Sequence, residues 1–338
     1  MAHWDFELKD NADNVLGVLP ARNRKYAKYL NNAGAASFET NLKYDDADVQ
    51  TLISAIAPSA TYVRIERDGK AMFQGEVQQP NEELSADSEV FTVPVLGHFA
   101  QLDDRFTPDL VTYTQIDQGT IAWNLINDSQ TVSGTFGITQ GVLTTGILRD
   151  RSYEMKRISD CIKELAACEQ GFDFEITPDK VFNVFYPQRG VRINGPVFEY
   201  GKNIVKVSRA YLKPKNLIRA IGAGEGENML KVSVGDASSI SLYGTREEIL
   251  SLKDVSIYNT LVEQATDYLN LWKLPPKVIR LDVKAGSDPE LGGYEEGDYI
   301  RVKVDYGRMQ IDTWLRIYGI EVSVDDNDFE SVSLITNP

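Results

Sequence analysis

The sequence is poor in the residues from which most enzyme and metal sites are built. Its 338 residues include only two histidines and two cysteines, and no stretch approaches the 18 apolar residues of a membrane-spanning helix. Two histidines leave little for a zinc or iron site. Cys161 and Cys168 lie in a predicted helix, where seven residues rise about 10.5 Å, too far for a disulfide. We therefore expect two buried thiols in a protein made in a cytosol, with no cofactor and no metal ion.

Positive charge is also scarce. The chain has 35 lysines and arginines against 50 aspartates and glutamates, a formal net charge of -15. An acidic surface repels nucleic-acid phosphates and anionic membranes, so we expect no stable binding to either. Such a surface keeps a protein soluble, and it also suits a passage through which DNA slides without sticking. Because residues 1–7 lack the basic and apolar regions of a signal peptide, we expect a protein that folds inside the cell where it is made.

Strand-forming residues, by contrast, are plentiful. The 16 tyrosines and 13 phenylalanines accompany short runs of β-branched residues, which favours β-structure. Residues 62–77 predict a hairpin with Asp68-Gly69 at its tip. A two-residue loop places Phe73 opposite Arg64, whereas a three-residue loop, 68–70, places Phe73 opposite Ile65. We expect the second register, because it keeps the apolar side chains on one face.

Apolar residues recur at helical spacing in several other segments. Val49, Leu52, Ile53 and Ile56 predict a short helix that Asp45 or Asp46 caps. Longer helices are predicted over 117–127, 153–170 and 259–272, and the second of these is expected to end in a left-handed conformation at Gly171. Thr245-Arg-Glu-Glu248 has the capping-box pattern that opens a helix. Short strands are predicted at 172–176, 181–186, 217–221 and 230–234.

Two distant parts of the chain have similar sequences. Residues 299–308 (YIRVKVDYGR) resemble 62–70 (YVRIERDGK), and each segment follows a predicted helix and continues to a similar strand. This echo predicts a duplication, with two related β-barrels or sandwiches on either side of a small helical module. We therefore expect an α+β, β-rich fold with a first β-barrel over 1–105, an α+β module over 106–204 and a second β-barrel over 205–338.

No residue pattern identifies a catalytic site. His98 would have to be the base of a Ser-His-Asp triad, but no Gly-x-Ser-x-Gly elbow accompanies it, so we expect a structural histidine. His3, in a terminal segment, is a weaker candidate. Asp103-Asp104 is interpreted as a turn at the end of a strand. The stretch 325–330 (DDNDFE) lacks the mid-loop glycine and the distant glutamate of a calcium hand, and a hairpin turn is expected there.

Two further stretches stand out. Arg22-Asn-Arg-Lys25, together with Lys28, is basic in an acidic chain and is either a subunit contact or a solvated strand face. The segment 219–230 (RAIGAGEGENML) has glycines at alternate positions, as a phosphate-binding loop has. However, its third glycine is one position too early for a dinucleotide fingerprint, a strand pattern follows it, and Glu225 and Glu227 repel phosphate. We interpret it as a turn between two antiparallel strands.

Several stretches, in this order and spacing, resemble the hub proteins of phage tail tips and baseplates. They are 30–38 (LNNAGAASF), 63–70 (VRIERDGK), 222–227 (GAGEGE) with 243–247 (YGTRE), and 296–299 (EGDY). The similarity runs over nearly the whole chain, and order and spacing carry it because each stretch alone is a common β-turn sequence. The type of the family is the central hub of the T-even contractile tail, with relatives in long non-contractile tails and in tail-derived secretion spikes.

The resemblance implies a structural protein of the virion and not an enzyme. It implies a homotrimer at the tail tip, in which two tube-type barrels per chain form a ring of six that docks on a hexameric tail tube or distal tail protein. It further implies contacts with a tape-measure protein and with tail fibre or spike proteins, DNA that passes only transiently through the lumen, and synthesis in the cytoplasm of a host bacterium. Since the chain stops at Pro338, soon after the last predicted strand, we expect a hub without the enzymatic or receptor-binding extension of many relatives.

Two alternatives stay open. A β-rich tail enzyme that degrades carbohydrate or cell wall would need an acidic cleft with two carboxyl groups about 5 to 9 Å apart, and a chain with 50 acidic residues offers many pairs. The hub of a contractile injection or secretion spike would share the predicted fold. We assign no catalytic, cofactor-binding or metal-binding residue.

Overall fold

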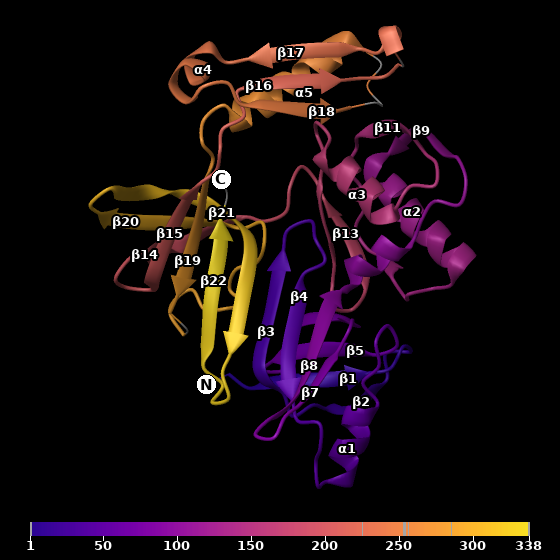
Figure 1. The fold of residues 1–338 in the computed structure, drawn as a ribbon, viewed down its shortest axis with the longest axis vertical. Helices are drawn as coiled ribbons and strands as arrows, with labels where there is room; N and C mark the ends of the chain where they lie inside the picture. The colour runs from indigo at the N-terminus through magenta and orange to yellow at the C-terminus, as the bar shows by residue number, and fades with distance from the viewer. Residues whose placement is uncertain (1, 225, 253–254, 256, 285, 337–338) are drawn as a thin grey trace. The chain divides into compact units, whose positions relative to one another are not determined.

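The computed structural model describes residues 2–224, 226–252, 255, 257–284 and 286–336. The chain divides into two compact units (Figure 1): unit 1 comprises Met1–Lys206 and Leu281–Ile335, and unit 2 comprises Val207–Arg280 and Thr336–Pro338. Three strands, β15 (Ile204–Tyr211), β19 (Lys277–Val283) and β22 (Glu330–Thr336), have residues in both units. Each unit has a hydrophobic core of its own.

The largest sheet has 14 strands, most of them in unit 1. Its continuous order is β15-β19-β22-β21-β3-β4-β8-β6-β5-β1-β2, with β7 beside β8 and with β20 between β14 and β21. The strands from the first part of the chain are β1 (Trp4–Lys9), β2 (Val15–Val18), β3 (Arg22–Tyr29), β4 (Ala35–Thr40), β5 (Tyr62–Arg67), β6 (Lys70–Val77), β7 (Asn81–Leu84) and β8 (Glu89–Gly97). Those from the later part are β14 (Arg192–Glu199), β20 (Tyr299–Tyr306), β21 (Met309–Val324) and β22 (Glu330–Thr336).

Alternating residues explain why these segments form strands with one face on a core. In β1, Trp4, Phe6 and Leu8 are buried, and the residues between them are half-buried. In β4, Phe38 and Thr40 are buried in the same alternation. A period of two is the pattern of a strand that covers a hydrophobic core with one face.

The β5–β6 hairpin has the predicted register but not the predicted loop. Ile65 pairs with Phe73, as expected. The turn consists of only two residues, Asp68 and Gly69, both at positive φ (50° and 76°). Met72 is the extra residue of a β-bulge in β6, so a two-residue turn and the apolar register exist together.

Helix α1 (Ala47–Ser54) precedes this hairpin. Of the two candidate caps, Asp46 is the one used, because its carboxylate accepts hydrogen bonds from the backbone N–H groups of Asp48 and Val49. Ile53 and Ile56 of the predicted apolar stripe are buried. The stripe and its cap therefore predicted this helix correctly.

The first and last parts of the chain share one sheet. β21 runs antiparallel to β3, with Gly319 opposite Tyr29 and Val324 opposite Arg24. The α+β, β-rich class is confirmed, but the two predicted barrels are not, because no sheet formed by the described strands closes on itself. Alternation along a segment predicts a strand, whereas closure depends on which distant edges meet.

The two similar segments at 62–70 and 299–308 both form hairpins. β20 and β21 are joined by a two-residue turn at Gly307, whose φ is 51°, with Tyr306 opposite Met309. The sequence similarity is therefore a similarity of hairpins, and the duplication stays a prediction.

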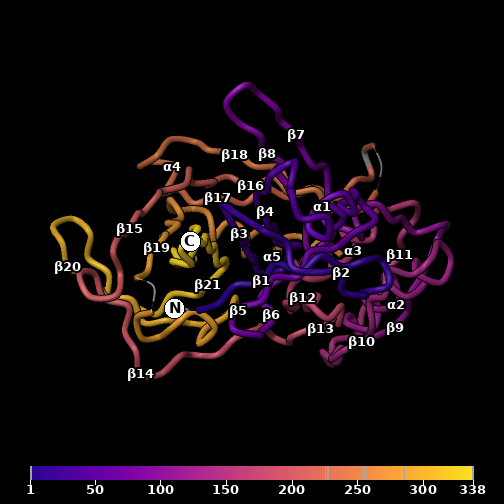
Figure 2. The backbone as a smooth tube through the Cα atoms, turned by 90° about the horizontal axis from the view of Figure 1, so that it is seen from below, coloured from indigo at the N-terminus to yellow at the C-terminus, as the bar shows by residue number. Residues whose placement is uncertain are grey.

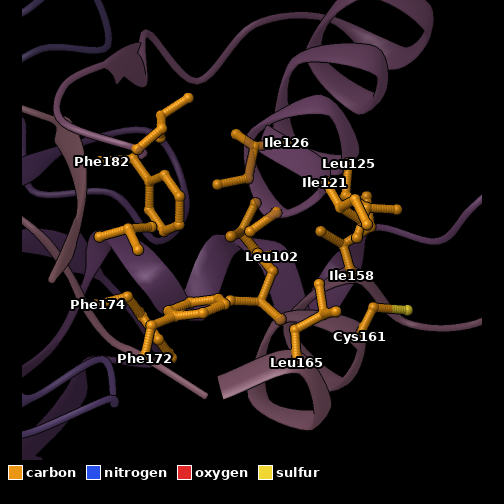
Figure 3. Packing of buried hydrophobic residues seen from close by; sticks show 14 of the residues in the cluster. Leu102, Ile121, Leu125, Ile126, Ile158, Cys161, Leu165, Phe172, Phe174 and Phe182 are labelled. Atoms are coloured by element: carbon orange, nitrogen blue, oxygen red, sulfur yellow. The ribbon is translucent and has the colours of Figure 1, made fainter. Parts of the chain in front are cut away.

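The middle of unit 1 is a helical segment with a separate core. Its elements are the 3-10 helix η1 (His98–Asp104), β9 (Val111–Asp117), α2 (Gln118–Ser133), β10 (Thr139–Gln140), β11 (Leu148–Tyr153), α3 (Ile158–Ala167), β12 (Asp173–Ile176) and β13 (Val181–Phe185). Figure 3 shows Ile126 and Leu165 on the helix side of Leu102, and the rings of Phe174 and Phe182 on the other side. All five side chains are buried.

Both helices of this segment differ in length from the prediction. α2 continues beyond the predicted residue 127 to Ser133. α3 is shorter than 153–170, because it begins at Ile158 and ends at Ala167. Of the predicted first turn, Tyr153 pairs with Val111 as the last residue of β11, and Arg157 forms a bridge with Phe106.

The predicted left-handed cap at Gly171 is wrong, although a glycine is needed there. Gln170 has the positive φ (53°), and the helix has already ended at Cys168. A Cβ on Gly171 would lie 2.0 Å from the carbonyl oxygen of Ala166. The glycine permits a close backbone approach, which no local pattern reveals.

Unit 2 is a three-stranded sheet with a helix packed on it. β16 (Leu217–Ile221) lies between β17 (Lys231–Gly235), which is antiparallel to it, and β18 (Glu247–Ser251), which is parallel. The helices are η2 (Gly226–Asn228), α4 (Ala237–Tyr243) and α5 (Tyr258–Trp272). Leu261, Ala265 and Leu269 of α5 pack in one core with Ile218 and Ala220 of β16, which confirms the helix predicted over 259–272.

The predicted helix at 245–248 is wrong, because β18 begins at Glu247. The helix of this region, α4, comes earlier and ends before Gly244, whose φ is 71°. Leu250 packs against the core of unit 2, and Arg219 of β16 forms a 3.0 Å ion pair with Glu247. Pairing with β16 outweighs the local capping pattern.

Two glycines allow the segment before β14 to touch the segment before β20. Gly190 and Gly297 both have positive φ (93° and 96°), and a Cβ on Gly190 would lie 2.2 Å from the carbonyl carbon and oxygen of Gly297. The backbone N–H of Val191 donates to Oδ1 of Asp298 over 2.8 Å, and the N–H of Tyr299 donates to the carbonyl of Val191 over 2.8 Å. The contact is made by backbone, so no side chain fits between the segments.

We predict that Gly190→Ala lowers the free energy of unfolding by more than the strain of a positive φ, which is about 1–3 kcal/mol. Gly195→Ala is the matched control, because Gly195 also has positive φ (115°) but open space at its Cβ position. Urea unfolding of both variants measures the difference. Equal losses of unfolding free energy for the two variants would show that the close approach at Gly190 does not contribute to stability.

Candidate functional site: a charged junction in unit 1

Charged side chains gather where β12, β21 and the two glycine segments meet. Arg316 of β21 and Asp173 of β12 form an ion pair in which each side chain is only 9% exposed. Arg316 also donates to the carbonyl oxygens of Gly297 (3.1 Å) and Arg189 (3.0 Å). The Asp173 carboxylate accepts from the backbone N–H of Arg189 (2.7 Å) and from the amide of Asn31 (2.8 Å). Both charges therefore have the further hydrogen bonds that buried ions require.

Arg189 extends this pair into a network. Its guanidinium lies 2.9 Å from Glu175, 2.9 Å from Glu295 and 3.3 Å from Glu296. Nζ of Lys28, on β3, lies 3.1 Å from the Glu296 carboxylate. We call the seven residues the junction: Lys28, Asp173, Glu175, Arg189, Glu295, Glu296 and Arg316. It joins segments from the first, middle and last parts of unit 1.

The junction contains more negative than positive groups in a partly buried space. Burial raises the pKa of Glu175, although the nearby Arg189 opposes the rise. Glu296 is 1% exposed. Within the described residues, its Oε1 atom has no hydrogen-bond partner. Each arginine of the junction thus has several partners, whereas one carboxylate oxygen of Glu296 has none among the described residues.

The junction borders a small cleft, whose lining includes Lys28, Glu175, Arg189 and Glu296 beside Phe73 and Phe174. Glycoside cleavage needs two carboxyl groups whose environments push their pKa values apart, one of them ready to give a proton. In this cleft both glutamates contact the same arginine. The arrangement is suited to holding chain segments together.

A second charged cluster anchors the other end of the β12–β13 hairpin. Lys180, which is buried, has its Nζ 2.8 Å from the Asp13 carboxylate and 4.4 Å from the centre of the Tyr62 ring. Asp179 accepts a 2.7 Å hydrogen bond from Arg64 of β5. The hairpin is therefore held to the first strands at its turn and to β21 at its base.

His98 lies beside this second cluster, at the start of η1. It is 2% exposed, and its ring centre is 5.8 Å from that of Tyr62. Neither ring nitrogen has a hydrogen-bond partner among the described residues. Burial, with the Lys180 ammonium as the second cause, lowers the pKa of His98 to about 4. His98 is therefore neutral at pH 7.

The other candidates from the sequence are dispersed. His3 is exposed and lies 3.1 Å from Asp5. Asp103 and Asp104 end the 3-10 helix η1, so the predicted strand-end turn is wrong, and Asp103 accepts a hydrogen bond from Ser159 of α3. These groups occupy separate places and do not meet His98.

The acidic stretch 325–330 contains the turn between β21 and β22, as predicted. Oδ1 of Asp325 accepts from the backbone N–H groups of Asn327 and Phe329. Asp328 forms a 2.7 Å ion pair with Arg24 of β3. The carboxylates thus stabilise the turn and fasten it to β3.

The basic run on β3 is divided between the interior of the chain and its surface. Arg24 is buried against the 325–328 turn, and Lys28 belongs to the junction. Arg22 and Lys25 are exposed. The two inward cations are used within the chain, and a subunit contact through the outward pair stays a prediction.

The glycine stretch at 222–227 connects β16 to β17, which are antiparallel, as predicted. Glu225 and the side chain of Glu227 lie outside the described residues. Cys161 is buried, and burial raises the pKa of its thiol to about 12. Cys168 is only half-buried, where the sequence predicted a buried thiol, because it caps the end of α3.

In the described part of the chain, no three His, Cys, Asp or Glu side chains are grouped so that they could hold a metal ion. No helix there is long and apolar enough to cross a membrane.

Part of the junction lies in a stretch that the sequence analysis singles out. Residues 296–299 (EGDY) carry part of the resemblance, and they supply Glu296 of the junction together with its neighbours Gly297 and Asp298. The sequence analysis does not identify Arg316, Asp173 or Arg189. An arginine between apolar residues in 314–320 (WLRIYGI) is the available signal, because a charge at an inward strand position needs a buried partner.

Comparisons by sequence found no similar protein. No protein-family model matches the chain. No curated protein matches it.

Comparisons by structure found similar folds. A tail protein from Neisseria meningitidis MC58 has a TM-score of 0.68 at 12% identity, and the match covers 99% of this chain and 96% of that one. The 43 kDa tail protein of prophage MuSo2 from Shewanella oneidensis has a TM-score of 0.68 at 14% identity, with 99% and 98% covered. The c3393 protein of E. coli, a component of the type VI secretion system with similarity to T4 tail proteins gp27 and gp5, has a TM-score of 0.52 at 9% identity, with 94% and 73% covered. The resemblance inferred from the sequence is confirmed: the chain has the fold of these tail and spike proteins.

We predict that Arg316→Met lowers the free energy of unfolding by about 3–5 kcal/mol, because it leaves the Asp173 carboxylate buried without its cation. Arg301→Met is the matched control on β20. Its ion pair with Asp312 is 2.6 Å long but half exposed, at 39% and 58%, and such surface pairs contribute about 0–1 kcal/mol. Guanidinium unfolding of both variants gives the comparison. Similar small losses would contradict a structural role for the junction.

We predict that His98 makes stability depend on pH. Its folded pKa of about 4 lies below the unfolded value of 6.5. The unfolded chain therefore binds a proton more readily, and stability that is present above pH 6.5 is lost as the pH falls toward 4, by about 3 kcal/mol. The measurement is urea unfolding at several pH values.

His98→Gln should flatten this part of the profile, since glutamine does not titrate. His3→Gln should leave the profile unchanged, because the His3 side chain is 72% exposed. A wild-type profile that is level between pH 6.5 and pH 4, or one that His98→Gln does not alter, would contradict this origin of the pH dependence.

Proposed function

We propose that this chain is a structural protein of a phage tail: a homotrimeric hub at the distal end of the tail tube. The observation that carries the proposal is the likeness to two tail proteins over 96% and 98% of their lengths as well as 99% of this chain. A match of that extent leaves no large part of the chain to a different fold. The junction supports a structural role as well, because its charges tie chain segments to one another.

In this proposal the trimer docks on the hexameric tail tube or on a distal tail ring, and it holds fibre or spike components. The tape-measure protein is a further partner, and DNA passes only transiently. The chain is made in the bacterial cytoplasm and ends in the virion tail tip. The division into 1–105, 106–204 and 205–338, with tube-type barrels at both ends, belongs to the same hypothesis. The acidic balance of the chain suits a lumen that DNA must traverse.

A second candidate is the hub of a contractile injection or secretion spike. The likeness to the E. coli secretion protein, which covers 94% of this chain, favours it. The two candidates share a fold and differ in the particle that contains them. Because the secretion protein matches with a lower TM-score and over less of its own length than the tail proteins, we prefer the phage tail.

We expect the purified protein to have a mass of about 113 kDa, three times its chain mass of 37.8 kDa, and to appear as a ring in negative stain. Light scattering after size exclusion, at several concentrations, measures the mass. The experiment is repeated with the distal tail protein of the same tail added, since assembly can need the neighbouring ring. A monomer under every condition would contradict the trimeric hub.

A further inference from the structure

Two projecting parts of unit 1 have opposite charge. The first is the β7–β8 hairpin, residues 81–89, which contains four acidic residues and no lysine or arginine. Every residue of β7 is exposed, and β7 pairs only with β8. The structure gives none of the four carboxylates an ion pair with another described residue. This hairpin is a free edge with a charge of -4.

An exposed leucine lies between glutamates on this hairpin. Leu84 is 77% exposed. Glu89 lies directly opposite it across the two strands, and Glu82 is two positions before it in β7. Cross-strand partners and residues two apart share a face of a strand pair. The face therefore presents one apolar side chain between two carboxylates.

The second part is formed by β14, the residues that follow it as far as Lys206, and β20 with its turn. Over 191–206 and 299–308 it has six lysines and arginines and two acidic residues, a net charge of +4 in a chain of -15. Tyr200 and Tyr306 contact each other edge to face, with 6.1 Å between ring centres, and are 44% and 71% exposed. Lys202 and Lys303 are exposed beside them, and Lys202 forms a surface ion pair with Glu199. We call this part the tyrosine arm.

The hairpin and the arm are apart within one chain. In Figure 1 the tip at β20 and the β7–β8 turn lie at different sides of unit 1, and Figure 2 shows the same separation from below. One surface has an apolar centre between anions, and the other has an aromatic centre between cations. The anions of one surface can therefore face the cations of the other surface on a second copy, with the apolar and aromatic centres in contact.

We propose that the β7–β8 hairpin of one copy docks on the tyrosine arm of a second copy. Leu84 packs on the rings of Tyr200 and Tyr306, and the glutamates face the arm's lysines. Apolar contact at the centre excludes water, and the surrounding charges set partner and orientation. Because the two surfaces differ, the contact is head-to-tail, the type that generates rings when its rotation closes. This inference rests on the proposed homotrimer and identifies the two surfaces that meet in it.

A charge-exchange series tests the docking by light scattering of the full chain over a range of concentrations at low salt. Glu82→Lys with Glu89→Lys should weaken assembly at least about tenfold, and Lys202→Glu with Lys303→Glu should do the same, because each pair creates like-charge contacts. All four changes in one chain should restore assembly to within about threefold of wild type. Circular dichroism and melting temperature verify that each variant folds.

Glu263→Lys with Asp267→Lys is the matched control. Both residues are exposed on α5, and the net charge changes as much as in the hairpin variant, so assembly should stay as in wild type. If this control weakens assembly as much as the hairpin variant does, the proposal is overturned. It is also overturned if the variant with all four changes does not recover assembly. A third result would also overturn the proposal. If the arm variant binds a single-stranded oligonucleotide differently from wild type while the mass of the assembly stays the same, the arm is assigned to nucleic acid.

Failure of this inference differs from failure of the proposed hub. If the hairpin and arm variants assemble as wild type does, the docking is wrong while the trimer stands. If the wild type stays monomeric even with the distal tail protein, both are wrong.

Discussion

The buried ion pair between Arg316 and Asp173 is the contact on which the arrangement of unit 1 depends. Arg316 belongs to β21, which pairs with β3 from the first part of the chain. Asp173 begins β12, whose Phe174 enters the core of the helical segment. The same guanidinium donates to the carbonyl oxygens of Gly297 and Arg189, so one side chain joins first, middle and last segments. A buried charge without its partner costs several kcal/mol, which makes any other arrangement of these segments unfavourable.

Charge has two separate uses in this acidic chain. Lys28, Arg189 and Arg316 turn inward and hold segments together, where low polarity strengthens each contact. Exposed carboxylates, by contrast, give the surface its sign, and those of the β7–β8 hairpin form no ion pair with another described residue. The first use keeps the interior in one shape, and the second leaves charged edges on the surface. The glutamates of the cleft serve the first use, because both contact Arg189.

Local features of the fold could be predicted from the sequence, and features set by distant contacts could not. Periodic patterns of apolar residues predicted α1, the register of Ile65 and Phe73, and α5, and the sequence offered Asp45 or Asp46 as the cap of α1. The bulge at Met72, the strand at 247–251 and the open sheet depend on neighbours far along the chain. The junction could be predicted only in part for the same reason. Residues 296–299 belong to the stretches that carry the resemblance. Asp173 and Arg316, however, are 143 residues apart, and no local pattern pairs them.

The central claim is that this chain is a structural component at the end of a tail. It is tested most directly by electron microscopy of particles from cells that carry the gene, with a gold-binding tag added to this chain. The account predicts gold at the distal end of the tail tube in intact particles. Purified particles that lack the label, or that bear it on the head, would contradict it.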